Sequence, residues 1–243
     1  MPTIYSETND GNQAGAINSN WDTVHDHTGL FNPNISHASY NFAVGAVYIS
    51  GRGSYFIRRS FFEFDTSGIT STVSSATFSL YITSTSYDNS NLIVVKSGHD
   101  PSDATEDWFG TWLTGLGGTL SGWSNSDSEV VAYSISEPAG MGAGYVNITL
   151  NSDALADLVS LSSFKIVVMN YSADYLDVAP TTLAWTGFNF ANQTGTSKDP
   201  KIDYTLAAGA GGYGQDVAGV ATANIETVIG VATGDIEKVI GVD

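Results

Sequence analysis

Residues 55–65 read Tyr-Phe-Ile-Arg-Arg-Ser-Phe-Phe-Glu-Phe-Asp and are the stretch that decides the fold. Phe62 and Phe64 are separated by one polar residue, and side chains two positions apart on a β-strand point to the same face. A turn is expected directly afterwards, because Asp65 is followed by Thr, Ser and Gly. The stretch therefore predicts a strand that places two aromatic rings on one face.

Arg59 lies inside this predicted strand, and two acidic residues follow it closely. A cation within a core strand favours a structural role over a functional one. We therefore predict a structural ion pair between Arg59 and either Glu63 or Asp65.

The chain shows the same two-residue periodicity as far as residue 206. Segments rich in Val, Ile, Phe, Tyr and Thr are separated by clusters of Gly, Asn, Asp and Ser. We predict an all-β protein, because about ten strands fit an antiparallel β-sandwich of two sheets. The predicted strands are 3–6, 43–50, 55–65, 75–83, 91–97, 129–135, 144–150, 164–169, 182–190 and 201–206.

One helix is predicted, at 151–161, where Asn151 or Ser152 is a suitable N-cap. The side chains expected to face inward are Leu155, Leu158 and Val159. Between residues 98 and 128 lies a long irregular stretch rich in Trp and Gly. A loop of that length is either functional or a flap that closes the core.

The composition limits the partners of the chain. Its 243 residues carry a formal net charge of -17, and only 14% of them are charged. Such a surface repels polyanions, which argues against nucleic acid and anionic membranes and leaves divalent cations open. Without Cys the chain has neither a disulfide nor a thiolate metal site. The sequence shows no apolar run of about 18 residues and no secretory signal pattern.

The last part of the chain is organised differently. Residues 207–215 have the composition of a flexible Gly/Ala-rich linker. Beyond it, residues 219–229 align with residues 230–240, and eight of the eleven aligned positions are identical. We therefore predict a β-sandwich domain at 1–206, a linker at 207–215 and a repetitive tail at 216–243.

Two short repeats cannot bury their own apolar side chains, because repeat units need neighbours that cover them. We predict that the tail docks in an oligomer of the chain, against another protein or back onto the sandwich. An eleven-residue period suits a helical bundle, whereas β-branched residues and Gly favour strand-and-turn units, so both remain open. The predicted docking residues are Val220, Ile225, Val228, Ile229, Val231, Ile236, Val239 and Ile240.

Two neighbouring motifs resemble a known family. Residues 59–69 read Arg-Ser-Phe-Phe-Glu-Phe-Asp-Thr-Ser-Gly-Ile, and residues 73–81 read Val-Ser-Ser-Ala-Thr-Phe-Ser-Leu-Tyr. Together they resemble the signature of the DNRLRE-domain family. Further stretches resemble its Trp-bearing segment and its last strand: Asp107-Trp108, Thr111-Trp112 and 199–204. The resemblance covers about residues 40–206 and implies a jelly roll similar to carbohydrate-binding modules.

A second resemblance concerns the arrangement of the whole chain. Residues 193–200, Gln-Thr-Gly-Thr-Ser-Lys-Asp-Pro, and the repeats of the tail resemble proteins of tailed bacteriophages and environmental viral genomes. This resemblance implies a virion surface component such as a decoration protein, a head fibre or a tail-associated adhesin. It agrees with an N-terminus that lacks a secretory signal pattern.

Motifs of the common enzyme classes are missing from the sequence. There is no Cys nucleophile and no Gly-x-Ser-x-Gly turn, and the Gly-rich tracts lead into linkers rather than helices. Glu106 and Asp107 are adjacent, so on an extended chain they point to opposite faces, which argues against a glycosidase. We expect no catalytic residues.

Two sets of side chains are candidate metal ligands. The cluster His25-Asp26-His27, with Asp22 and His37 nearby, suits a transition metal, and a polar loop is the alternative interpretation. Carboxylates in loops supply hard oxygen ligands for a structural calcium ion, and solvated acidic loops are the alternative there. The candidate calcium ligands are Glu7, Asp10, Asp103 and Asp107, with Asn12 and Asp100 beside them.

Trp108, Trp112 and Trp123 are candidate glycan-binding residues. A flat aromatic ring covers the apolar face of a sugar, while neighbouring Asp and Asn side chains bind its hydroxyl groups. Indoles are mostly buried in globular domains, so core packing is the competing interpretation.

We therefore expect a non-enzymatic virion structural protein at the virion surface, whose partners are other virion proteins or further copies of itself. Decoration protein, head fibre and tail-associated protein are the forms expected. The alternative is a carbohydrate-binding module or surface adhesin, extracellular or at the cell surface, with a cell-surface glycan as partner. We expect no cofactor, and a structural calcium ion is the alternative.

Overall fold

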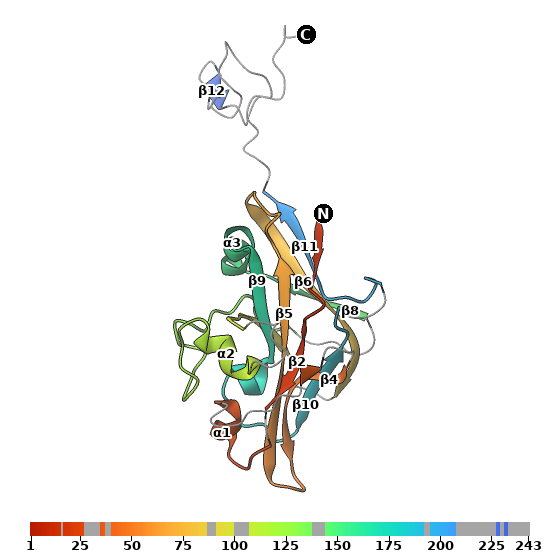
Figure 1. The fold of residues 1–243 in the computed structure, drawn as a ribbon, viewed down its shortest axis with the longest axis vertical. Helices are drawn as coiled ribbons and strands as arrows, with labels where there is room; N and C mark the ends of the chain where they lie inside the picture. The colour runs from red at the N-terminus through yellow and green to blue at the C-terminus, as the bar shows by residue number, and fades with distance from the viewer. Residues whose placement is uncertain are drawn as a thin grey trace. The chain divides into compact units, whose positions relative to one another are not determined.

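The computed structural model of the chain contains two compact units, Met1–Thr205 and Leu206–Asp243. The residues that it describes are 1–15, 17–26, 35–36, 40–86, 91–99, 107–137, 144–191, 195–207, 227–228 and 231–232. The strands up to residue 206 are β1 (Thr3–Tyr5), β2 (Gly11–Ala14), β3 (Ile35–Ser36), β4 (Tyr40–Ile49), β5 (Ser54–Asp65), β6 (Val73–Ser86), β7 (Leu92–Lys96), β8 (Gly144–Thr149), β9 (Ser163–Asn170), β10 (Leu183–Phe188) and β11 (Lys201–Leu206). The helices are α1 (Trp21–His25), α2 (Trp108–Thr114), α3 (Ser152–Ser160) and the π-helix η1 (Tyr171–Tyr175). The prediction of an all-β, antiparallel protein is confirmed (Figure 1).

The predicted strand at 129–135 is wrong. This segment runs beside β7 and makes an isolated bridge, Val95 to Ala132, instead of a continuous ladder. A side chain takes the place of a backbone acceptor there, because Ser134 Oγ accepts a hydrogen bond from the Val94 N–H at 3.1 Å. The other nine predicted strands correspond to β1 and to β4 through β11.

Strand β5 organises the sheet, because its two halves pair with different neighbours. Ser54 to Arg58 pair with β4, and Ser60 to Asp65 pair with β9, while β2 pairs with the middle of the strand. From β5 the sheet divides into two branches (Figure 1). One branch runs through β4, β10, β6, β11 and β1, with β8 also paired to β6, and the other runs from β9 to β7.

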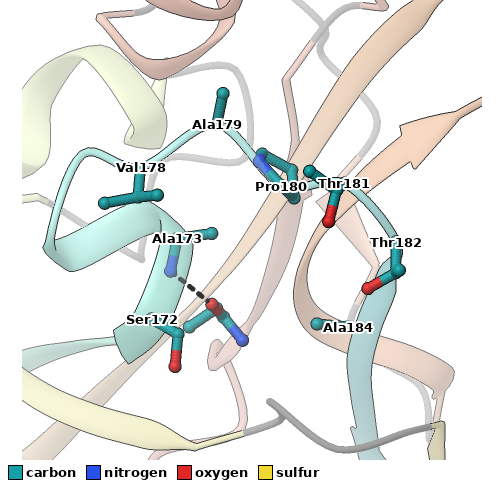
Figure 2. A pocket seen from close by; sticks show the side chains of 9 residues that line it. Ser172, Ala173, Val178, Ala179, Pro180, Thr181, Thr182 and Ala184 are labelled. Carbon is teal, nitrogen blue, oxygen red and sulfur yellow. Dashed lines mark hydrogen bonds between the residues drawn. The ribbon is translucent and has the colours of Figure 1, made fainter.

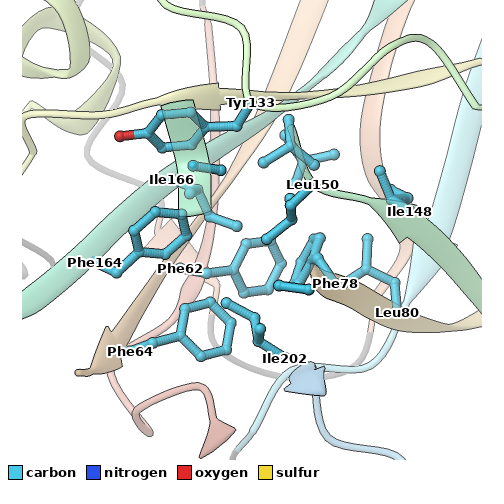
Figure 3. Close-up of a cluster of buried hydrophobic side chains, with 14 of the residues drawn as sticks. Phe62, Phe64, Phe78, Leu80, Tyr133, Ile148, Leu150, Phe164, Ile166 and Ile202 are labelled. Atoms are coloured by element: carbon cyan, nitrogen blue, oxygen red, sulfur yellow. The ribbon is translucent and has the colours of Figure 1, made fainter. Parts of the chain in front are cut away.

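The alternation of side chains along β5 builds two buried cores. Phe62 and Phe64 lie in the first, which we call the sheet core, and Phe61 lies in the second, which we call the helix core. The sheet core contains side chains from both branches, among them Phe62, Phe64, Phe78, Leu80, Tyr133, Ile148, Leu150, Phe164, Ile166 and Ile202 (Figure 3). The helix core also contains residues of α1 and α2, and its larger members are Trp21, Ile57, Phe61, Ile93, Val95, Trp108, Phe109, Trp112, Leu113, Trp123, Val167 and Met169.

Strands β7 and β9 contribute to both cores. In β7, Val94 belongs to the sheet core and Val95 to the helix core. In β9, Val168 belongs to the sheet core and Val167 to the helix core. Because both faces of these strands are buried, their sequences are continuous apolar runs rather than alternating ones. The sheet is therefore covered on the helix-core side by α1, α2 and the segment after α2.

Helix α3 forms where the sequence predicts it. Asn151 is its N-cap, and the Asn151 Oδ1 accepts hydrogen bonds from the Asp153 and Ala154 N–H groups at 3.1 Å each. Leu158 is fully buried in the sheet core, and Leu155 and Val159 are partly buried against it. The predicted inward face is confirmed. Among the helices of the described residues, none is long and apolar enough to cross a membrane.

The second unit contains two short strands, β12 (Thr227–Val228) and β13 (Val231–Ala232). They pair antiparallel, with Val228 opposite Val231. Whether the repeats as a whole are helical or strand-and-turn units stays a prediction. The remaining predicted docking residues lie outside the described residues: Val220, Ile225, Ile229, Ile236, Val239 and Ile240.

Candidate functional site

Arg59 and Asp174 form a buried ion pair in the helix core. Arg59 Nη2 donates to Asp174 Oδ1 at 2.7 Å, and Arg59 Nε donates to Oδ2 at 2.9 Å. Both side chains are 0% exposed. An ion pair is therefore present, but the predicted partners Glu63 and Asp65 are wrong. Four positions along an extended strand span about 13 Å, which is beyond the reach of these side chains.

Aromatic rings enclose the guanidinium group of Arg59. Its central carbon lies 4.2 Å from the ring centroid of Phe109 and 5.4 Å from those of Trp112 and Trp123. Arg59 Nη2 also donates to the backbone carbonyl of His25 at 3.2 Å. Cation–π contacts of this kind gain strength when water is excluded. The cation thus holds α1, α2 and η1 against the same strand.

His25 connects the end of α1 to η1 and is 0% exposed. Its Nε2 lies 2.9 Å from the backbone carbonyl of Asp174, and its Nδ1 lies 3.0 Å from Asp26 Oδ1 and 3.3 Å from Asp177 Oδ1. Because protein groups occupy both ring nitrogens, the predicted transition-metal role is wrong for His25. His27 and His37, the other imidazoles of that cluster, lie outside the described residues.

The predicted glycan-binding residues Trp108, Trp112 and Trp123 are 0%, 0% and 1% exposed. The Trp123 ring stacks on His25 with a centroid distance of 4.4 Å, and its Nε1 donates to the His25 carbonyl at 3.3 Å. A buried indole has no free face on which a sugar can stack. The structure therefore corrects the glycan-platform prediction, and the competing interpretation as core residues describes their positions.

The segment from Asn170 to Thr182 has an unusual backbone. It begins with a π-helix, and Asp177 has a φ of 50°, the left-handed region that side chains other than Gly seldom adopt. Asn170 caps η1 by accepting the Ala173 N–H at 2.9 Å, and Asp177 Oδ1 accepts from Trp21 Nε1 at 2.8 Å. π-helical turns and strained residues are frequent at functional sites. We refer to residues 170–182 as the η1 loop.

A pocket of about 200 Å³ lies beside the η1 loop and the start of β10 (Figure 2). Its lining residues are Asn170, Ser172, Ala173, Val178, Ala179, Pro180, Thr181, Thr182 and Ala184. Asn170, Ala173 and Ala184 are buried, whereas Val178 is 54% exposed. The lining offers hydroxyl groups, an amide and small apolar side chains, and it includes no charged side chain. Such a surface suits a small neutral ligand.

Of the predicted calcium ligands, Glu7 and Asp10 share one turn, in which the Asp10 N–H donates to the Glu7 carbonyl at 3.1 Å. Glu7 is exposed, Asp10 is buried, and Asp107 is the N-cap of α2, with its Oδ1 accepting the Gly110 N–H at 3.1 Å. Asp103 lies outside the described residues. Within the described part of the chain, no three His, Asp or Glu side chains are grouped as metal ligands.

Asp10 makes contacts that join distant segments. Its Oδ2 accepts from Ser6 Oγ at 2.7 Å, and both carboxylate oxygens accept from the Ala191 N–H, at 3.2 and 3.0 Å. The side chain is 0% exposed. Burial raises the pKa of Asp10 from 3.8 to about 7, and the charge of Asp199 adds to this increase.

Asp10→Asn is expected to remove a pH dependence of stability. An acid whose folded pKa lies above its unfolded value stabilises the fold while protonated, and this contribution is lost as the pH rises from about 4 to about 7. An amide does not ionise and still accepts a hydrogen bond from Ala191. At about 1.4 kcal/mol per pKa unit, the variant should exceed the wild type in unfolding free energy by up to about 4 kcal/mol at pH 8.

Urea unfolding at about pH 4 and pH 8, with divalent cations removed, measures this difference. At the lower pH the two proteins should be similar in stability. A variant that is less stable than the wild type at the higher pH would contradict the expected sign.

Sequence reasoning missed the partner of Arg59 and the η1 loop. Asp174 lies 115 positions after Arg59, and no local pattern connects the two residues. The segment was recognisable only as polar residues after a strand, since Asn170 and Ser172 favour turns. The pocket depends on how this segment packs against β10, which a strand pattern does not contain.

The fold and the site define an antiparallel β protein in which a buried ionic network supports a strained loop and a small neutral pocket. A comparison with protein-family models finds no match, and a comparison with curated proteins finds no relative.

Proposed function

We propose that the chain is a non-enzymatic structural protein of a virion surface: a decoration protein, head fibre or tail-associated protein. In this proposal the first unit is a jelly-roll-like β-sandwich that is displayed, and the C-terminal repeats anchor or oligomerise the chain. The partners are other virion proteins or further copies of the same chain.

The sandwich part of the proposal is supported by the sheet core. This core joins side chains of β5, β7 and β9 to side chains of β6, β8 and β11, and these strands belong to the two branches of the sheet. Two β layers that share one apolar core are the defining feature of a sandwich. The first half of β5 pairs with β4 and its second half pairs with β9, so in this proposal β5 belongs to both layers of the sandwich.

The observation that carries the functional proposal is the apolar, repetitive sequence of the tail, which belongs to a second compact unit. The unit boundary lies between Thr205 and Leu206, and within the tail β12 and β13 form a hairpin with two strand residues on each side. A lone two-stranded hairpin is marginally stable in water, and repeats gain stability from the neighbours that cover them. A tail of this kind is best explained by a partner that completes it.

The contacts of the buried charged groups agree with a structural role for the chain. Arg59, Asp174 and His25 contact one another and the surrounding rings, so they hold elements together. A surface with a formal net charge of -17 also keeps displayed domains soluble and apart from one another.

Deleting residues 216–243 tests the proposal. The truncated chain is expected to stay folded and soluble, with the same unfolding midpoint as the full chain, and to lose assembly. Analytical ultracentrifugation and recovery with particles, in cells that produce the native assembly, measure the loss. A truncated chain that still assembles normally would remove the anchoring role of the tail.

The pocket beside the η1 loop favours a second function, the binding of a neutral glycan. Its hydroxyl and amide groups match the hydroxyl groups of one sugar residue, and its volume of about 200 Å³ accommodates a ring of that size. Thr181→Trp places a large side chain at the exposed rim, whereas Thr205→Trp is a matched change at an exposed position of β11. Glycan-array binding that is lost only in Thr181→Trp would support this function, and a silent array for the wild type would count against it.

A further inference from the structure

Two buried carboxylates lie near Ser6 in the first unit. Asp10 is 0% exposed and Asp199 is 5% exposed. Ser6 Oγ donates to Asp10 Oδ2 at 2.7 Å, and the Ser6 N–H donates at 3.0 Å to the carbonyl of Pro200, the residue after Asp199. Two carboxylates brought together away from water repel each other, and burial of charge is costly unless a counter-charge is present.

Asp199 has a buried oxygen without a partner. Its Oδ1 accepts no hydrogen bond from any residue that the structure describes. The neighbouring lysines are engaged elsewhere, since Lys201 Nζ lies 2.8 Å from Asp203 Oδ2 and Lys198 Nζ lies 5.0 Å from the Tyr81 ring centroid. An unpartnered buried carboxylate oxygen requires either a proton or a cation.

Neither of the lysines next to Asp199 along the chain pairs with its carboxylate. A divalent cation would neutralise both carboxylates at once.

We propose that Asp10, Asp199 and Ser6 form a calcium site, which connects the turn between β1 and β2 to the start of β11. All three side chains supply oxygen atoms, and calcium prefers oxygen ligands in a flexible geometry of about six to eight positions. Two carboxylates balance the charge of the ion, and backbone carbonyl groups and water complete the coordination. Magnesium demands a stricter octahedral arrangement at shorter distances, so calcium is favoured.

The site keeps one residue of the set expected from the sequence and replaces the others. Asp10 remains, while Asp199 is added; Glu7 is exposed, and Asp107 is engaged as the N-cap of α2. With two carboxylates the affinity is expected near a Kd on the order of 10⁻⁴ to 10⁻³ M. The inference concerns the first unit alone and does not depend on the role of the tail.

Thermal unfolding of the full chain with and without calcium chloride tests the site. After removal of metal with a chelator, about 10 mM calcium is expected to raise the Tm by about 3–6 °C, whereas the same concentration of magnesium has a smaller effect. Asp199→Asn should abolish the rise. Asp153→Asn removes one exposed carboxylate of α3 and should keep it, which controls for a general effect of net charge.

Terbium luminescence gives a second readout that does not depend on stability. The Tyr145 hydroxyl donates to the Asp199 carbonyl at 3.0 Å, so its ring lies close enough to sensitise terbium bound in place of calcium. Emission excited through tyrosine should appear in the wild type and disappear when calcium is added in excess. Tyr145→Phe should reduce this emission and keep the calcium-dependent rise in Tm.

The calcium site is overturned by either of two results. A wild type without a rise in Tm and without displaceable terbium emission overturns the site, and so does an Asp199→Asn variant that responds to calcium like the wild type. If Asp199→Asn does not fold, Asp10→Asn provides the same comparison, because its amide is expected to be tolerated. Loss of the response in that variant supports the site, and a full response overturns it.

Discussion

Asp174→Ala is expected to lower the free energy of unfolding by about 3–5 kcal/mol. The substitution removes the carboxylate that binds Arg59 through two hydrogen bonds, and it leaves a guanidinium group that is 0% exposed without a counter-charge. The loss should also release the η1 loop, because Asp174 belongs to η1 and its carbonyl contacts His25. Urea unfolding followed by tryptophan fluorescence measures the change.

A double variant separates the cost of the unpaired charge from that of lost packing. The double variant Arg59→Met/Asp174→Ala should lose less unfolding free energy than the two single variants lose when their losses are added, by about 1–3 kcal/mol. Asp177→Ala is the control in the same loop, because its carboxylate is 48% exposed, accepts a hydrogen bond from Trp21 and lies 3.3 Å from His25 Nδ1 without contacting Arg59. We expect it to cost about 1 kcal/mol. An Asp174→Ala variant as stable as this control would contradict a role for the buried pair.

Trp112→Ala is the second change with a large expected effect, a loss of about 3–5 kcal/mol in unfolding free energy. Trp112 is 0% exposed, its ring contacts that of Trp123 at a centroid distance of 5.1 Å, and it lies beside the Arg59 guanidinium group. Removing the indole leaves a cavity in the helix core and takes away one of the rings that enclose the cation. Chemical unfolding at neutral pH measures the loss.

Trp112→Phe is the control for this prediction. The Trp112 Nε1 has no hydrogen-bond partner among the described residues, so a smaller aromatic ring gives up no hydrogen bond there. We expect a loss of less than about 1.5 kcal/mol. A Trp112→Ala variant that keeps wild-type stability and loses binding to a glycan would reverse the assignment of this residue to the core.

The strands and one helix could be predicted because their signals are local. Phe62 and Phe64 share a face through the two-residue repeat of a strand, and both lie in the sheet core. Asn151 caps α3 because its side chain reaches the N–H groups of the first turn. Each of these features depends on residues within a few positions, so the pattern in the sequence is enough.

Elements without a strong local pattern were missed. Strand β2 reads Gly-Asn-Gln-Ala, which has low strand propensity, and it exists because its residues pair with β5. Helix α2 contains Gly110 and begins in a stretch expected to be irregular, yet Asp107 caps it and the helix core covers its aromatic residues. Tertiary pairing and burial supplied the stability that local preference did not.

The sequence by itself determined the all-β character of the chain, the positions of most strands, the capped helix α3 and the presence of the apolar repeats. These properties follow from the spacing of apolar residues and from groups that are neighbours along the chain. Only the tertiary structure decided that Arg59 pairs with Asp174, that the tryptophans are core residues, and that Asp10 lies near Asp199. The reason is physical: a contact between residues more than about 100 positions apart is set by how the sheet divides and packs, and no short pattern records that choice.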